Sequence, residues 1–133
     1  MAKTPRTVLA TAQVLTGSFA VVGTAYDTTY LSEVTFELVW GKASATGLEL
    51  AVEGRLSSAG QWIPAEPTYD AGAAIVDDVA EVATGFLLHQ YTVEGALPAL
   101  VVPVGGFREL RIRARETGTP GGTLDAAAGG VTG

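Results

Sequence analysis

Three segments of the chain alternate apolar and polar side chains with a period of two. They are Glu33–Trp40, Leu48–Glu53 and Glu109–Arg115. Because successive side chains of a β-strand point to opposite faces, each segment has one apolar face and one largely charged face. This pattern is typical of antiparallel sheets with one buried side. In the first two segments the expected core-facing side chains are Val34, Phe36, Leu38, Trp40, Leu48, Leu50 and Val52.

Other apolar and β-branched runs lie between turns rich in Gly, Pro and Ser, which is typical of short strands. The expected strands are 7–15, 19–22, 30–40, 48–56, 61–64, 86–93, 100–104, 108–116 and 123–128. We expect 48–56 to pair with 30–40 as a hairpin, and 73–83 tolerates a helical turn or two. About eight short strands predict an all-β fold, an antiparallel β-sandwich or jelly roll.

The length and composition indicate one globular domain. With 133 residues, 47% of them hydrophobic, the chain can bury a sizeable core. We expect an N-terminal arm over residues 1–6 and a single domain over residues 7–133, with a long loop region around 65–104. The net charge of −6 argues against nucleic acid as a partner.

No signal peptide or membrane span is expected. Thr7, Thr11 and Gln13 interrupt the first apolar run, so it does not read as a signal peptide. No apolar run approaches the roughly 20 residues that a membrane span needs. We therefore expect synthesis in the cytoplasm and no membrane partner.

Basic side chains cluster late in the chain, where Arg108, Arg111, Arg113 and Arg115 are half of all Lys and Arg residues. One interpretation is a basic stripe that faces an acidic partner. The other is that the last three arginines pair across strands with acidic residues of the outer face. The acidic candidates are Glu33, Glu37, Glu49 and Glu53. We favour the second interpretation, because solvated charged faces are the ordinary case.

Candidate chemistry is sparse, and we assign no catalytic, cofactor-binding or metal-binding residue. Asp77, Asp78 and Glu81 are three carboxylates without the spacing of a calcium loop. The single histidine, His89, accompanies no nucleophile elbow, so we expect no enzyme. Trp62, beside a turn, is a candidate for an exposed sugar-binding ring, and a carbohydrate-binding β-sandwich module stays open as an alternative.

The order of several segments resembles a family of proteins. These segments are Leu31–Trp40, Gly47–Glu53, Gly60–Pro64, Glu109–Ala114 and the turn Thr117–Gly122 with its closing strand. Over most of residues 26–130 they look like small β-sandwich virion proteins of tailed bacteriophages. The resemblance implies a structural role in the virion, without catalysis, as a head decoration (cement) protein or as a neck or tail component.

For a decoration protein, we expect self-association, with a trimer favoured, over the junctions between subunits of the major capsid protein or against other virion proteins. The N-terminal arm and the loop region would then reach neighbouring subunits. The candidate interface residues are Lys3, Arg6, Trp62, Ile75, Val76, Val79, Val82, Leu97 and Leu100. The equally weighted alternative is that the apolar residues of the loop region fill the core of their own domain.

Overall fold

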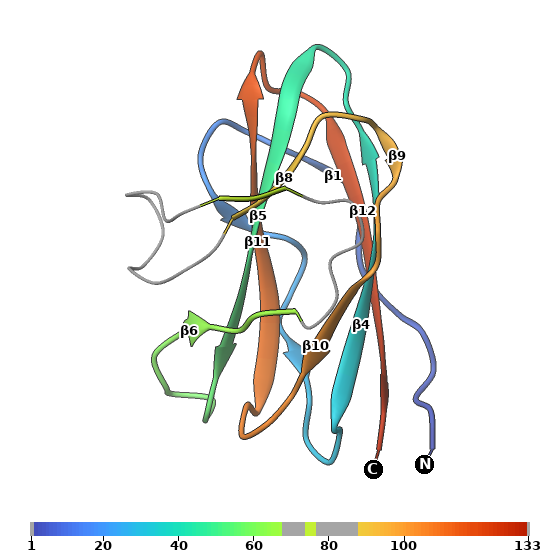
Figure 1. The fold of residues 1–133 in the computed structure, drawn as a ribbon, viewed down its shortest axis with the longest axis vertical. Helices are drawn as coiled ribbons and strands as arrows, with labels where there is room; N and C mark the ends of the chain where they lie inside the picture. The colour runs from blue at the N-terminus through green and yellow to red at the C-terminus, as the bar shows by residue number, and fades with distance from the viewer. Residues whose placement is uncertain (1, 68–73, 77–87, 133) are drawn as a thin grey trace.

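The computed structural model describes residues 2–67 and 88–132, and the backbone of residues 74–76. Two antiparallel sheets pack face to face, as Figure 1 shows. This confirms the expected all-β sandwich. Within the described part, eight strands have three or more residues and the others are two-residue pairings. No helix in this part is long and apolar enough to cross a membrane.

The first sheet, called sheet A, has the strand order β1-β12-β4-β10, with β9 pairing to β4. Its strands are β1 (Thr7–Val14), β4 (Glu33–Gly41), β9 (Gly95–Ala96), β10 (Leu100–Pro103) and β12 (Thr123–Val131). The last described strand therefore lies in the middle of the sheet, where β12 pairs along its whole length with β4 and on its other side with β1.

The second sheet, called sheet B, has the order β2-β11-β5-β8-β7, with β3 pairing to β11 and β6 to β5. Its longer strands are β5 (Ala45–Arg55), β7 (Ala74–Val76), β8 (Leu88–Tyr91) and β11 (Glu109–Gly118). Its two-residue strands are β2 (Ala20–Val21), β3 (Tyr26–Asp27) and β6 (Ile63–Pro64). The region 65–104 thus supplies strands to both sheets.

The core forms between the inner faces of the sheets. Every core-facing side chain expected in β4 and β5 is buried there. Inner-face residues of the partner strands complete it: Leu100, Val102, Leu110, Ile112, Ala114, Leu124, Ala126 and Ala128. The carboxylate of Glu116 is also buried there. It accepts hydrogen bonds from Trp40 Nε1 at 2.8 Å and from the amides of Gly121 and Gly122 at 2.9 Å, and these bonds compensate for its burial.

The expected hairpin between 30–40 and 48–56 is wrong. Strand β4 belongs to sheet A and β5 to sheet B, so the connection through Lys42 crosses between the layers. Ala43 in this turn has a φ of 49°, and the Ala45 amide bonds the Lys42 carbonyl at 3.0 Å. Alternation requires only an apolar face against a core, and two strands in facing sheets satisfy it as well as two paired strands.

The segment 73–83 and the N-terminal residues also differ from expectation where the structure describes them. The helical turn expected within 73–83 is wrong for Ala74–Val76, which pair with β8 as strand β7. The remainder of that segment lies outside the described residues. Residues 2–4, expected to begin a separate arm, lie along the end of β12: the Thr4 amide bonds Gly130 and the Thr132 amide bonds Ala2. The two termini therefore emerge side by side at one end of the sandwich (Figure 1).

Candidate interaction surfaces

The outer face of sheet B carries a ladder of charges from β5 and β11. The register sets Arg111 opposite Glu53 and Arg115 opposite Glu49. Arg111 Nε lies 2.6 Å from Glu53 Oε1, and Arg115 Nε lies 2.7 Å from Glu49 Oε1. Arg113 Nη1 lies 3.4 Å from the second oxygen of Glu53. The cross-strand pairing favoured for these three arginines is therefore confirmed with Glu49 and Glu53.

The other two acidic candidates do not take part, because Glu33 and Glu37 lie on β4 in the opposite sheet. Glu37 instead lies 3.1 Å from Arg6 Nε, and both side chains of that pair are mostly exposed. The arginines pair with carboxylates of their own sheet. The alternation of apolar and polar residues does not show to which sheet a strand belongs.

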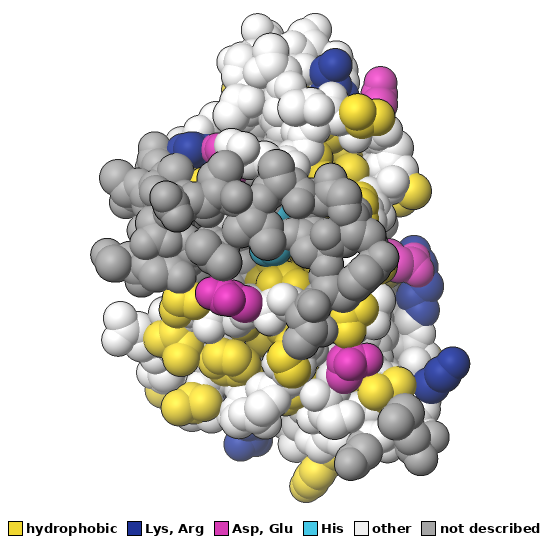
Figure 2. Space-filling model, in the orientation of Figure 1, with side chains coloured by type: hydrophobic (Ala, Val, Ile, Leu, Met, Phe, Trp, Pro, Cys, Tyr) yellow, Lys and Arg dark blue, Asp and Glu magenta, His cyan; other side chains and the backbone are white. Residues whose placement is uncertain are grey.

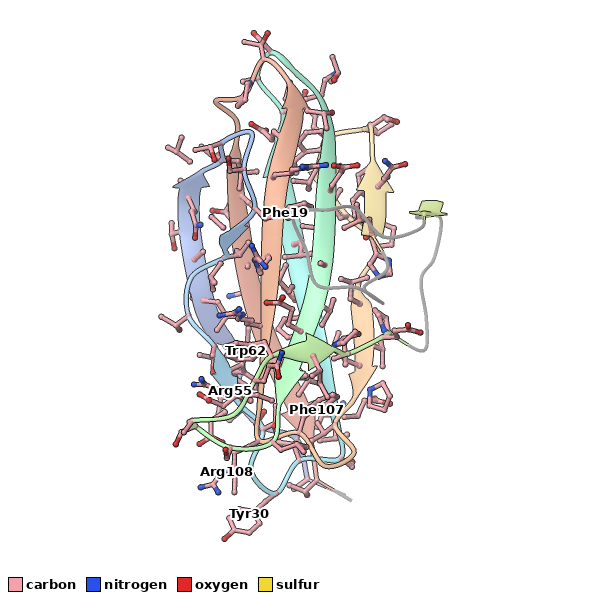
Figure 3. The ribbon with its side chains drawn as sticks, turned by 90° about the vertical axis from the view of Figure 1, so that its left-hand side faces the viewer. Phe19, Tyr30, Arg55, Trp62, Phe107 and Arg108 are labelled. Atoms are coloured by element: carbon pink, nitrogen blue, oxygen red, sulfur yellow. The ribbon has the colours of Figure 1, made fainter. Side chains whose placement is uncertain are left out.

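Two aromatic rings cover the ladder. The guanidinium carbons of Arg55 and Arg111 lie 4.5 and 4.0 Å from the centre of the Trp62 ring. Phe19 lies under the guanidinium of Arg115, 4.5 Å from its ring centre. Figure 3 shows Trp62 beside Arg55 along the sheet. Trp62 is half-buried, and its ring is occupied by cations of its own chain rather than lying open.

The remaining interface candidates fall in different places. Lys3 and Arg6 are exposed at the N-terminus, and Leu97 is half-buried against the core. Leu100 is completely buried opposite Phe36 in sheet A, so the core interpretation holds for it and it offers nothing to a partner. Ile75 and Val76 lie in β7 without described side chains, and Val79 and Val82 lie outside the described residues.

Of the histidine and the carboxylates considered for chemistry, only His89 lies within the described residues. His89 is buried in β8, opposite Leu50. The carboxylates of Asp77, Asp78 and Glu81 lie outside the described residues. Among the residues that are described, no three His, Asp or Glu side chains gather into a group that would hold a metal ion.

One end of the sandwich presents a surface that the sequence did not point out. Tyr30 is 90% exposed, and its φ of 69° is a left-handed conformation that aromatic residues rarely adopt. It projects from the lower end of the molecule in Figure 3, near Arg108. The loops that carry Tyr30 and Arg108 border an open, shallow hollow of about 380 Å³. We name this end, Tyr30 with Arg108 and the hollow between their loops, the Tyr30 end.

Hydrogen bonds fix the loop of Tyr30 to both sheets. Thr28 donates from its hydroxyl to the Phe107 carbonyl at 2.7 Å and from its amide to the Arg108 carbonyl at 2.9 Å. On the other side, the Ser32 amide bonds the Val131 carbonyl at 2.8 Å. Because the loop is held at both ends, the strained backbone of Tyr30 is imposed by its surroundings.

Arg108 differs from the other arginines in its charged partners. Of the six arginines, five form ion pairs with Glu37, Glu49, Glu53 or Glu109. Exposed Arg108 forms none with the part of the chain that is described. The carboxylate of neighbouring Asp27 is held by the hydroxyl and the amide of Thr29, at 2.6 and 2.9 Å. These two bonds, and to a smaller extent the charge of Arg108, lower the pKa of Asp27 below its usual value.

Among known proteins, a similar fold is found in one solved structure from a prophage. No protein-family model matches the chain, and no curated protein does. The crystal structure of the SPBc2 prophage-derived protein YomS is similar, with a TM-score of 0.52 and 12% sequence identity, over 96% of this chain and 93% of that one. At this identity the likeness shows the fold, which the chain shares with a phage-derived protein over nearly the full length of both.

Proposed function

We propose that the chain is a structural protein of a bacteriophage particle, and specifically a head decoration protein that binds across capsid subunits. The observation that supports this most is the fold shared end to end with a prophage-derived protein. The likeness covers the whole sandwich rather than one motif. It agrees with the resemblance of residues 26–130 to virion proteins, which rests on the strand pattern alone.

The described surface supports a binding role that needs no reaction. On the outer face of sheet B, the three arginines of β11 are all paired with carboxylates of the same chain. Exposed apolar side chains remain, among them Tyr30, Leu56, Ile63 and Val93. Hydrophobic side chains gather in the lower half of the face in Figure 2, over β6 and β10. Apolar side chains held by a folded sandwich provide contact area at little entropic cost.

A decoration protein would stabilise a head through many equivalent weak contacts. Each copy contributes a modest buried area, and retention comes from the number of copies that bind neighbouring subunits at once. The exposed Lys3 and Arg6 remain candidates for contact with capsid subunits, as does the half-buried Trp62, whose ring already contacts Arg55 and Arg111.

The test begins with particles of the phage that encodes this chain. Mass spectrometry of purified particles should find the protein in many copies, and immunogold electron microscopy should label the head. Heads that lack the protein should release DNA at a lower temperature than heads to which purified protein has been added back. Absence from purified particles overturns the structural role, whereas label confined to the neck or tail overturns only the decoration role.

A further inference from the structure

We propose that copies of this chain join head to tail, with the Tyr30 end of one copy bound to a second surface, around Val93 and Glu94, on the next. This proposal concerns contacts between copies and does not depend on which part of a particle they occupy. Each of the two surfaces contains one highly exposed apolar side chain. Tyr30 and Val93 are the two most exposed large hydrophobic residues of the described chain, at 90% and 77%.

The second surface carries an exposed carboxylate, that of Glu94, where the Tyr30 end carries the cation of Arg108. Val93 precedes the exposed Glu94, and both line a hollow of about 350 Å³ with Leu97 and Pro98. The carboxylate of Glu94 accepts the amide of Lys42 at 3.1 Å and forms no ion pair within the described ranges. We name these four residues the Val93 surface.

The two surfaces carry opposite charges at Arg108 and Glu94, and each combines an exposed apolar side chain with a hollow. Each has one projecting apolar side chain beside a hollow, so Tyr30 can enter the hollow bordered by Leu97 and Pro98. An aromatic ring buries about 150–250 Å² in such a contact. Arg108 carries the positive charge of one surface and Glu94 the negative charge of the other, and docking one on the other pairs both.

The surfaces cannot meet within one molecule. The loop of Tyr30 comes directly before β4, whereas β9, next to Val93 and Glu94, pairs with Val39 and Trp40 near the opposite end of β4. Nine residues of strand span roughly 25–30 Å. The distance between the two surfaces therefore requires a second copy.

The contact must also join unlike surfaces rather than two copies of the same surface. A two-fold pairing of Tyr30 ends would set Arg108 against Arg108, and a pairing of Val93 surfaces would set Glu94 against Glu94. Like charges in contact are strongly unfavourable. Contacts between different surfaces generate a closed ring if the rotation closes, which includes a trimer, and a filament if it does not.

The first test is charge exchange, read by sedimentation velocity at about 1 µM to about 1 mM protein, a range that covers weak to moderate affinities. The unmodified chain should self-associate. Arg108→Glu should weaken association by about a hundredfold, because it sets like charges together. Adding Glu94→Arg should restore most of the loss. Glu37→Lys, at an exposed site on neither surface, changes the net charge by the same amount in the opposite direction and should have little effect.

The second test uses the absence of cysteine from the chain. Arg108→Cys and Glu94→Cys variants, mixed under mild oxidation, should form disulfide-linked dimers that contain one copy of each. Neither variant alone, nor Glu37→Cys mixed with either, should cross-link at a comparable rate. Tyr30→Ala added to the first variant should slow cross-linking about tenfold.

Three outcomes overturn the proposal. One is an unmodified chain that stays monomeric up to about 1 mM, the upper limit of a specific weak contact. Another is a double charge exchange that fails to restore association although circular dichroism shows a native fold. The third is cross-linking of Arg108→Cys with itself, which would indicate a two-fold contact.

Discussion

The outer face of sheet B and the Tyr30 end both place an aromatic ring near arginine, yet they have opposite consequences. On the sheet, Trp62 lies against Arg55 and Arg111, each paired with a carboxylate from the neighbouring strand. At the Tyr30 end, Arg108 forms no ion pair with a described carboxylate, and its charge acts only as a minor contribution to the low pKa of Asp27. The number of arginines therefore does not identify a binding surface. What matters is whether the strand register brings a carboxylate within reach of each one.

The largest expected effect on this comparison comes from Glu53→Ala. Glu53 is 2% exposed and serves both Arg111 and Arg113, so its loss leaves two cations without a partner. Both arginines retain some access to water, which reduces the penalty for a broken buried pair to about 2–3 kcal/mol of unfolding free energy. Urea denaturation measures this loss.

The matched control is Glu37→Ala on the opposite sheet. Its ion pair with Arg6 is exposed on both sides, so it should cost less than about 0.5 kcal/mol. Equal costs for the two variants would show that burial does not distinguish the ladder from an ordinary surface pair.

A smaller loss is expected from Trp62→Ala. The substitution removes a half-buried ring and two contacts between cations and its face, which together are worth about 1–2 kcal/mol. Thermal unfolding followed by circular dichroism measures it. Trp62→Phe keeps a ring and should recover part of the loss. An alanine variant as stable as the unmodified protein would mean that the Trp62 ring does not stabilise the charge ladder.

Tyr30→Gly should change stability in the opposite direction. Glycine adopts a φ of 69° without strain, whereas tyrosine does not, so we expect a gain of about 0.5–1 kcal/mol in unfolding free energy. Tyr30→Ala retains a Cβ atom and should show no such gain. If both variants lose stability, the ring contributes to the fold, and the contrast between a structural Trp62 and an available Tyr30 fails.

The smallest expected effect is electrostatic. Thr29→Ala removes the hydroxyl that contributes most to the low pKa of Asp27, so the pKa should rise towards its usual value. Because the folded pKa is lowered, the contribution of Asp27 to stability is complete above the pKa of the unfolded chain. It is lost as the pH falls through the folded pKa. NMR titration of the Asp27 carboxyl measures both forms, and an unchanged pKa in the variant would contradict the assignment.

The sequence predicted the strands and their inner faces well but not their partners. Alternation identified Phe36 and Leu50 as core residues, since burial depends only on which face a side chain takes. It could not place β4 and β5 in different sheets, because facing and paired strands share the same pattern. The same gap explains why Glu49 and Glu53 were expected among the partners of the arginines together with two residues of the other sheet.

The interaction surfaces were harder to predict. The left-handed backbone of Tyr30 results from hydrogen bonds to Phe107, Arg108 and Val131, which are far away in sequence. The sequence also gave no reason to separate Arg108 from the three arginines that follow it. That distinction depends on Arg108 preceding β11, outside the register that pairs the others. Leu100 is the opposite case: it was expected at an interface but lies in the core. The sequence does not distinguish an apolar strand residue in a core from one at a surface.

The central position of β12 has a consequence for synthesis in the cell. Strand β1 is made first among the described strands, yet its neighbour in sheet A is the strand made last. A ribosome that stops before residue 123 releases a chain in which β1 and β4 have nothing between them. Such fragments cannot complete the sandwich or hold residues 2–4 and Ser32 in place. Only chains translated through β12 would then be competent to assemble, and prematurely terminated products would be left to proteolysis.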